Sequence, residues 1–247
     1  MIEVTERDGV VLLRLAEGKA NAMSLEFCDA LTARFAALSS ARAVVLTGTG
    51  HIFSAGVDLK RLVDGGDAYV RKFLPALSTM LATVFSHPAP VVAAINGHAI
   101  AGGCVLACAA DRRLMVRDGG RIGVTELLVG VPFPPVAMEI MRCATAPQFF
   151  AEAIFSGATY TALEAGERGW VHDVIEEEQA LIDRAVKSAN ALAALPPQVY
   201  SLSKQQTRQP ALERMNDPEL DAEIEQIWNA PETLARIRDF IARTLRK

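Results

Sequence analysis

The distribution of apolar positions along the chain predicts strands and helices in alternation. Three short runs rich in apolar residues, typical of buried strands, lie at residues 43–48, 90–97 and 112–116. After Ser24, a suitable N-cap, apolar residues recur at the spacing of one helix face, at Leu31, Phe35 and Leu38. Strands and helices that alternate in this way predict an α/β fold.

Both ends of the chain carry further local signals. The opening residues form two strand-like segments joined by Asp8-Gly9, a pattern that predicts a hairpin. Thr161 and Glu164 form a capping box before a short helix. Beyond residues 195–197 the chain becomes helical and more charged, and its last segment carries an apolar stripe. This stripe, which either packs on the same subunit or contacts another one, consists of Leu234, Ile237, Ile241 and Leu245.

The longest apolar stretch, residues 89–110, has the length of a membrane span. Polar residues and glycines, among them Asn96, Gly97 and His98, interrupt it near its middle. We therefore expect a strand, a turn and a buried helix in this stretch, and no membrane partner.

Composition narrows the classes of partner further. With 247 residues, of which 51% are hydrophobic, the chain is able to bury one sizeable core. A formal net charge of −4 gives no general electrostatic reason to expect binding to nucleic acid or to a membrane surface. The four cysteines form no CxxC pair and no zinc-like spacing. They are therefore predicted to be buried free thiols, which suit a reducing cytoplasmic location, and no metal site is expected.

Two glycine-bearing turns are the candidates for chemistry. FSAGVDL occupies residues 53–59 and INGHAIAGGCVL occupies residues 95–106, where it opens a helix. Glycine lets the backbone approach a ligand closely, and free N–H groups at the start of a helix favour negative charge. Two such N–H groups directed at one point form an oxyanion hole, although each turn alone is more typical of an ordinary tight turn.

Together, the two turns resemble in order and separation the signature segments of the crotonase (enoyl-CoA hydratase/isomerase) family. The resemblance extends to GKANAMSLEF near the start, RIGVTELLVGV in the middle and YTALEAGERGWVHDVI later, and so covers most of the chain. The chain is most similar to the mitochondrial-type Δ3,Δ2-enoyl-CoA (dodecenoyl-CoA) isomerase branch. This implies a crotonase (ClpP-like) spiral of ββα units over residues 1–195 and a C-terminal helical trimerisation region over residues 196–247.

The resemblance also implies the ligand and its contacts. The substrate would be an acyl-CoA thioester, with no separate cofactor, and the assembly a homotrimer or homohexamer. The backbone N–H groups of Val57 and Gly102 would form the oxyanion hole for the thioester carbonyl. Other residues of the first turn, Ala55, Gly56, Asp58 and Leu59, would line the acyl-CoA path. The CoA nucleotide would contact Lys19, Ala20 and Asn21.

The number of carboxylates at the site distinguishes hydration from double-bond migration. Hydratases of the family use two glutamates, whereas this chain has one at the corresponding positions. Val105 occupies the position of the first glutamate and Glu126 that of the second. Hydration requires groups that activate water and protonate the α-carbon, whereas moving a double bond requires a single base and acid. An apolar Val105 would also help to exclude water. We therefore expect Glu126 to carry a proton from C2 to C4, with a pKa raised by an apolar site.

Three neighbouring residues leave alternatives open. Thr125 would contact the substrate or shape the turn, and Phe133 would wall the acyl-tail pocket or pack on the core. Glu139 would supply a second carboxylate to a hydratase, although an exposed helix glutamate is the ordinary case. The competing functions are therefore an isomerase, a hydratase or thioester hydrolase on the same scaffold, and a non-catalytic acyl-CoA-binding protein.

Overall fold

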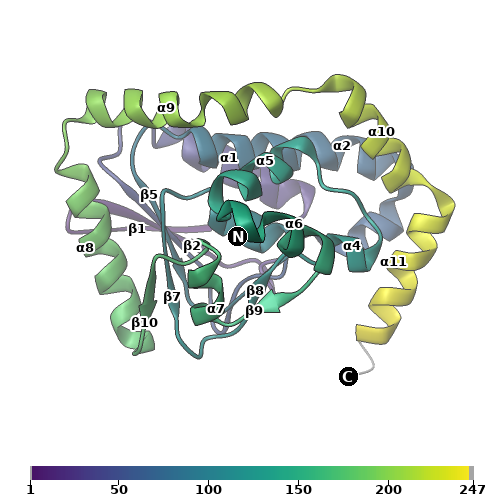
Figure 1. Ribbon diagram of the computed structural model, residues 1–247, viewed down its shortest axis with the longest axis horizontal. Coiled ribbons are helices and arrows are strands. Elements are labelled where there is room, and N and C mark those ends of the chain that lie inside the picture. Colours follow the sequence, from purple (N-terminus) through teal and green to yellow (C-terminus); the bar gives the residue numbers. More distant parts are fainter. Residues whose placement is uncertain (1, 245–247) are drawn as a thin grey trace.

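The computed structural model describes residues 2–244, which form two β-sheets surrounded by helices (Figure 1). The larger sheet has the spatial order β1 (Ile2–Arg7), β2 (Val10–Leu15), β3 (Val44–Thr47), β5 (Val91–Ile95), β7 (Arg112–Val116) and β10 (Asp173–Ile175). The smaller sheet has the order β4 (Ile52–Ser54), β6 (His98–Ile100), β8 (Ile122–Gly123) and β9 (Thr159–Tyr160). Neighbouring strands are parallel except in the pairs β1–β2 and β8–β9.

One structural unit occurs three times along the chain. In each unit a first strand joins the larger sheet, the next strand joins the smaller sheet, and a helix follows. The three units are β3–β4–α2 (Leu59–Ser86), β5–β6–α3 (Gly102–Cys108) and β7–β8–α4 (Glu126–Val129). This arrangement confirms the predicted α/β fold and its spiral of ββα units.

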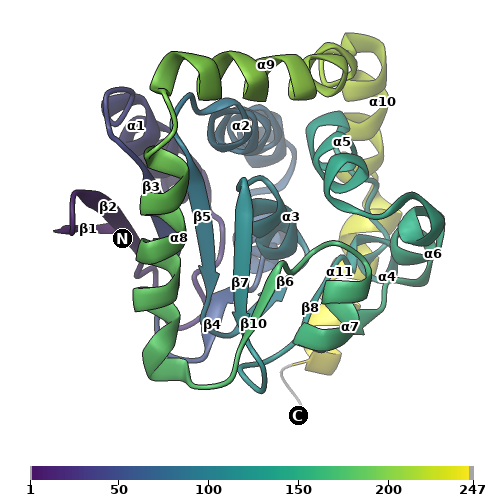
Figure 2. The same ribbon diagram turned by 60° about the vertical axis from the view of Figure 1, so that its left-hand side comes forward.

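Further helices complete the fold around the two sheets. Those that follow the hairpin and the third unit are α1 (Leu25–Ala37), α5 (Pro135–Ala144), α6 (Pro147–Ser156) and α7 (Ala162–Glu167). A 3-10 turn (Glu178–Ala180) leads into α8 (Leu181–Ala193), which packs on one face of the sheet, while α2 and α3 lie on the other (Figure 2). Every residue of β3 and β5 is buried, so apolar residues point to both faces without alternation, and Thr47 at the end of β3 is the one polar residue of the two strands.

Several local predictions are confirmed by backbone geometry. Asp8 and Gly9 have φ values of 53° and 76°, as the tight hairpin turn requires. Ser24 caps α1 by accepting a hydrogen bond of 3.2 Å from the N–H of Phe27, and the capping box at Thr161 begins α7.

The length of α2 and the exposure of one cysteine were not predicted from the sequence. The sequence signals gave no indication of a 28-residue helix, because α2 contains Pro75 and a kink at Gly66, where φ is 56°. Cys143 is exposed, so the prediction of buried thiols holds for the other three cysteines alone.

Residues 2–244 contain neither a candidate membrane span nor a candidate metal cluster. None of their helices combines the length and hydropathy of a membrane span. No group of three or more His, Cys, Asp or Glu side chains in this part of the chain is placed to hold a metal ion.

The chain ends in three consecutive helices, α9 (Pro197–Arg214), α10 (Pro218–Asn229) and α11 (Pro231–Thr244), which run along the top and right of Figure 1. Ile237 on α11 is fully buried, and Leu234 and Ile241 are partly buried against the core. These three stripe residues therefore pack within the same subunit, whereas Leu245 lies outside the described residues. The role of residues 196–247 in trimerisation stays a prediction.

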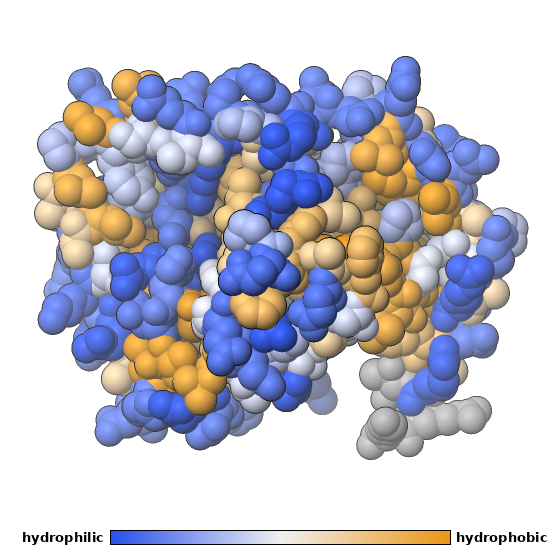
Figure 3. All heavy atoms as spheres, in the orientation of Figure 1, coloured by the Kyte–Doolittle hydropathy of each residue, from blue (hydrophilic) through white to orange (hydrophobic). Residues whose placement is uncertain are grey.

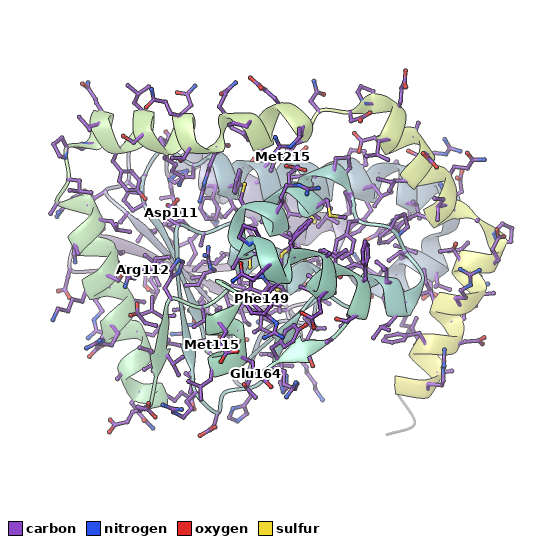
Figure 4. The ribbon with its side chains drawn as sticks, viewed as in Figure 1. Asp111, Arg112, Met115, Phe149, Glu164 and Met215 are labelled. Atoms are coloured by element: carbon purple, nitrogen blue, oxygen red, sulfur yellow. The ribbon has the colours of Figure 1, made fainter. Side chains whose placement is uncertain are left out.

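A buried ion-pair cluster ties α9 to the core. Asp111, labelled in Figure 4 beside Arg112, is the residue immediately before β7. Its carboxylate pairs with two cationic side chains of α9. Lys204 Nζ and Arg208 Nη2 each lie 2.8 Å from one of its carboxylate oxygens. Burial lowers the pKa of Lys204 to about 8, and the charge of Asp111 opposes this shift. Asp111 thus compensates two cations for the hydration that they lose.

Replacing Asp111 by asparagine should strongly destabilise the fold. The Asp111→Asn variant keeps the side-chain shape but leaves two buried cations without a counter-charge, so we expect a loss of about 3 kcal/mol in the free energy of unfolding. Urea unfolding measures this loss. Asp67→Asn, which removes an exposed partner of Arg71, is the control and should change stability little. Equal effects of the two variants would contradict the anchoring role of the cluster.

Candidate active site

The two glycine-bearing turns lie in direct contact. β4 and β6 are parallel neighbours, so the turns that follow them meet at the same edge of the smaller sheet. Gly56 has a φ of 82°, and a Cβ atom there would lie 2.8 Å from the carbonyl oxygen of Ile100 and 3.0 Å from the nitrogen of Gly102. Glycine at position 56 therefore permits both the left-handed backbone and the close approach.

This contact brings together the two N–H groups expected to form an oxyanion hole. Val57 follows Gly56 directly, and Gly102 begins α3 immediately after Ala101, whose φ is 52°. Within residues 2–244, neither the N–H of Val57 nor that of Gly102 donates a hydrogen bond to another protein group. Both donors are therefore available to a ligand oxygen.

Backbone hydrogen bonds from the segment at residues 19–23 hold the first glycine-bearing turn, residues 53–59, in place. The N–H of Ala55 donates to the carbonyl of Ala20 at 3.0 Å, and the N–H of Met23 donates to that of Gly56 at 2.8 Å. The side-chain amide of Asn21 is buried and donates to two carbonyls of β4. Asn21 thus positions the turn and has no side-chain donor left for a nucleotide, whereas Lys19 is exposed.

The turns line a cavity of about 90 Å³ whose wall also includes Glu126. Its walls are Ala55, Val57, Leu59, Ile100, Ala101, Thr125, Glu126, Val129, Val131, Trp228 and Phe240. Among these described residues, Glu126 is the only one with an ionisable side chain. Thr125 borders the cavity as the residue before α4, and Asp58 caps α2 by accepting a hydrogen bond of 3.0 Å from the N–H of Arg61.

Burial determines the protonation of Glu126. The residue is 9% exposed, and its Oε2 atom is buried without a hydrogen-bond partner in the described structure. Burial raises the pKa of Glu126 to about 7, and the backbone N–H groups of Glu126 and Thr125 oppose this effect. A carboxyl group with this pKa exchanges a proton readily near neutral pH.

No second carboxylate reaches this cavity among the described residues. Val105 is fully buried on α3, within the hydrophobic core rather than on the cavity wall. The expectation of an exposed Glu139 was wrong, because this side chain is 5% exposed and bonded to Arg142 at 2.9 Å and to Arg214 at 2.7 Å. Burial raises the pKa of Glu139, but the two arginines outweigh it and hold the pKa below its usual value.

Three aromatic residues complete the description of the site. Phe133 is buried, but it lines a different cavity, which it shares with Glu139. Trp228 on α10 and Phe240 on α11 line the cavity of Glu126 instead. Sequence reasoning missed both residues because they carry no local motif, and the fold alone brings them beside a residue about a hundred positions earlier.

A family model, related sequences and a solved structure all relate this chain to enoyl-CoA hydratases and isomerases. The model of the enoyl-CoA hydratase/isomerase family matches residues 5–234. A putative enoyl-CoA hydratase of Thermus thermophilus is 34% identical over 157 residues, which span 60% of this chain and 61% of that protein. The human mitochondrial enoyl-CoA delta isomerase 1 is 27% identical over 221 residues, 87% of this chain and 72% of that protein. The crystal structure of human mitochondrial Δ3-Δ2-enoyl-CoA isomerase superposes with a TM-score of 0.93 at 23% identity, covering 99% of this chain and 98% of that one.

The raised pKa of Glu126 predicts a specific pH dependence of stability. Because the folded state favours the protonated carboxyl, stability should fall as pH rises from the unfolded pKa of 4.5 to the folded value of about 7. Glu126→Gln removes this loss, so its advantage over the unmodified protein should grow by up to about 3 kcal/mol between about pH 4 and pH 8. Urea unfolding of both proteins at each pH measures it. A pH-independent difference would contradict the assignment.

Proposed function

The chain belongs to the enoyl-CoA hydratase/isomerase family, and within it we propose that this protein moves the double bond of a 3-enoyl-CoA to position 2. The observation that carries the proposal is the carboxyl group of Glu126. It is buried, has an unpartnered oxygen, and is the only ionisable side chain among the described residues that line the cavity between the two turns.

The first step is removal of a proton from C2 by the carboxylate of Glu126. The C2–H electron pair moves toward the thioester, whose carbonyl oxygen becomes the oxygen of an enolate. That oxygen accepts hydrogen bonds from the N–H groups of Val57 and Gly102, which have no other acceptor in the described structure. Fixed donors of this kind stabilise the charge where it develops.

The second step returns the proton at C4. The electron pair of the former 3,4 double bond takes the proton from Glu126, a new double bond forms between C2 and C3, and the carbonyl is restored. Glu126 is again a carboxylate, so one group serves as both base and acid. A pKa of about 7 suits both roles, because neither protonation state is strongly disfavoured near neutral pH.

The same geometry argues against the competing functions. Hydration and thioester hydrolysis both require an activated water, for which a second acid–base group would be expected. Glu139 does not fill this role, since two arginines hold it in another cavity. A protein that only binds acyl-CoA would gain nothing from an unpartnered buried carboxyl group, which lowers stability.

The remaining contacts and the assembly are part of the proposal. Lys19 and Ala20 are the proposed contacts of the CoA nucleotide. The proposed lining of the acyl-CoA path consists of Ala55, Gly56, Asp58 and Leu59. The proposed assembly is a homotrimer or homohexamer in which residues 196–247 make the subunit contacts.

An absorbance assay with two substrates tests the reaction. With 3-enoyl-CoA we expect formation of the conjugated thioester, and with 2-enoyl-CoA little loss of conjugation. Glu126→Gln should lower the isomerisation rate by at least about 100-fold, because it removes the proton carrier, while saturated acyl-CoA still binds. Glu139→Gln should remain active. Rapid loss of conjugation in 2-enoyl-CoA that depends on Glu139 would establish a hydratase instead.

The pH–rate profile tests the protonation state of the free enzyme. Since the first step requires the carboxylate, kcat/KM should rise with pH and level off above a midpoint of about 7. Steady-state rates with a 3-enoyl-CoA between about pH 5 and pH 9 measure the profile. A constant kcat/KM across this range would rule out Glu126 as the base.

A further inference from the structure

A second, larger cavity is lined by sequence neighbours of residues that line the cavity of Glu126. At three points along the chain, one residue lines the cavity of Glu126 and its immediate sequence neighbour lines the second cavity. Glu126, Val131 and Trp228 line the first cavity, whereas their neighbours Leu127, Pro132 and Ile227 line the second. The side chain of Trp228 and the segment at residues 131–132 therefore form a partition between the two cavities.

Trp228 is held firmly in this partition. It is 2% exposed, and its indole N–H donates a hydrogen bond of 3.1 Å to the carbonyl of Pro132. A buried tryptophan whose N–H is satisfied in this way keeps one orientation, because rotation would leave the donor unpaired. The partition is therefore a fixed part of the site.

The two cavities differ greatly in size. The cavity of Glu126 measures about 90 Å³ and the second about 430 Å³. A cavity of about 150 Å³ is large enough for benzene, so the smaller cavity holds roughly four carbon atoms. The lining of the second cavity is largely apolar and includes Phe155 on α6, which is 73% exposed. Apolar side chains also gather on the surface between α6 and α10 (Figure 3).

We infer that Trp228 closes the acyl pocket and restricts the protein to short acyl groups, of roughly four carbon atoms. This inference rests on the proposed function, because it takes the cavity of Glu126 as the place of the acyl group. The carbons between the thioester and C4 fill that cavity, and the partition stops a longer tail from reaching the second one. Phe133, which lines the second cavity, would then contact a tail only if the partition were open.

Binding and turnover across a series of chain lengths test the inference. Butanoyl-, hexanoyl- and decanoyl-CoA, which have no double bond to move, report binding by calorimetry, and the corresponding 3-enoyl-CoAs report kcat/KM. For the unmodified protein we expect the butanoyl compound to bind at least about tenfold more tightly than the decanoyl compound, with a similar ratio in kcat/KM. Equal or tighter binding of decanoyl-CoA would overturn the inference.

Substitutions in the partition sharpen the test. Trp228→Ala should join the two cavities, so the ratio of decanoyl to butanoyl affinity should rise at least about tenfold, whereas Trp228→Phe, which keeps an aromatic ring, should retain the preference for short chains. Ile227→Ala is the matched control, because this neighbour lines the second cavity alone. An unchanged ratio in Trp228→Ala would contradict the role of Trp228. If that variant does not fold, Phe240→Ala enlarges the same cavity from α11 and should shift the ratio in the same direction.

The binding series also separates this inference from the proposed reaction. A preference for short saturated chains together with no isomerisation of any 3-enoyl-CoA would refute the proposed function and leave the inference on chain length standing. Isomerisation that is equally fast for all chain lengths would refute the inference and leave the proposed function standing.

Discussion

A buried carboxyl group without a full set of hydrogen-bond partners is the constraint on which the site depends. Ionised carboxylates are strongly hydrated, so placing Glu126 among apolar walls raises its pKa to about 7 and makes the charged form costly to the fold. The surrounding structure must therefore be stable enough to hold this group. The three ββα units provide that stability and place Glu126 at the start of α4, beside the two turns that end β4 and β6.

The C-terminal helices contribute to the site as well as to the fold. α9 is tied to β7 through the buried pairs of Asp111, and the following helices α10 and α11 bring Trp228 and Phe240 to the cavity wall. The shape of this cavity, the proposed acyl pocket, thus depends on helices more than one hundred residues away from the glycine turns along the chain. A change that loosens the docking of α9 should therefore also alter the site.

Local patterns predicted what local interactions determine. The apolar runs marked the strands β3, β5 and β7, Asp8-Gly9 marked the hairpin turn, and the capping residues Ser24 and Thr161 marked helix starts. The resemblance to a family then directed attention to Glu126 and the two turns, and the structure brings these together in one cavity. Features set by distant partners were not predictable. Glu139 is buried because Arg214, 75 positions later, pairs with it, and Trp228 has no sequence signal of its proximity to Glu126.

The ionisation of Glu126 in the free protein is the quantity that the whole account requires. It can be measured directly by following the carboxyl carbon resonances of glutamate in 13C-labelled protein as a function of pH, with Glu126→Gln used to assign the signal. The account predicts a titration with a midpoint at about 7, well above the ordinary value of 4.5. A midpoint near 4.5 would show that the carboxyl group is hydrated or paired, and would contradict both the dry site and the single-base chemistry built on it.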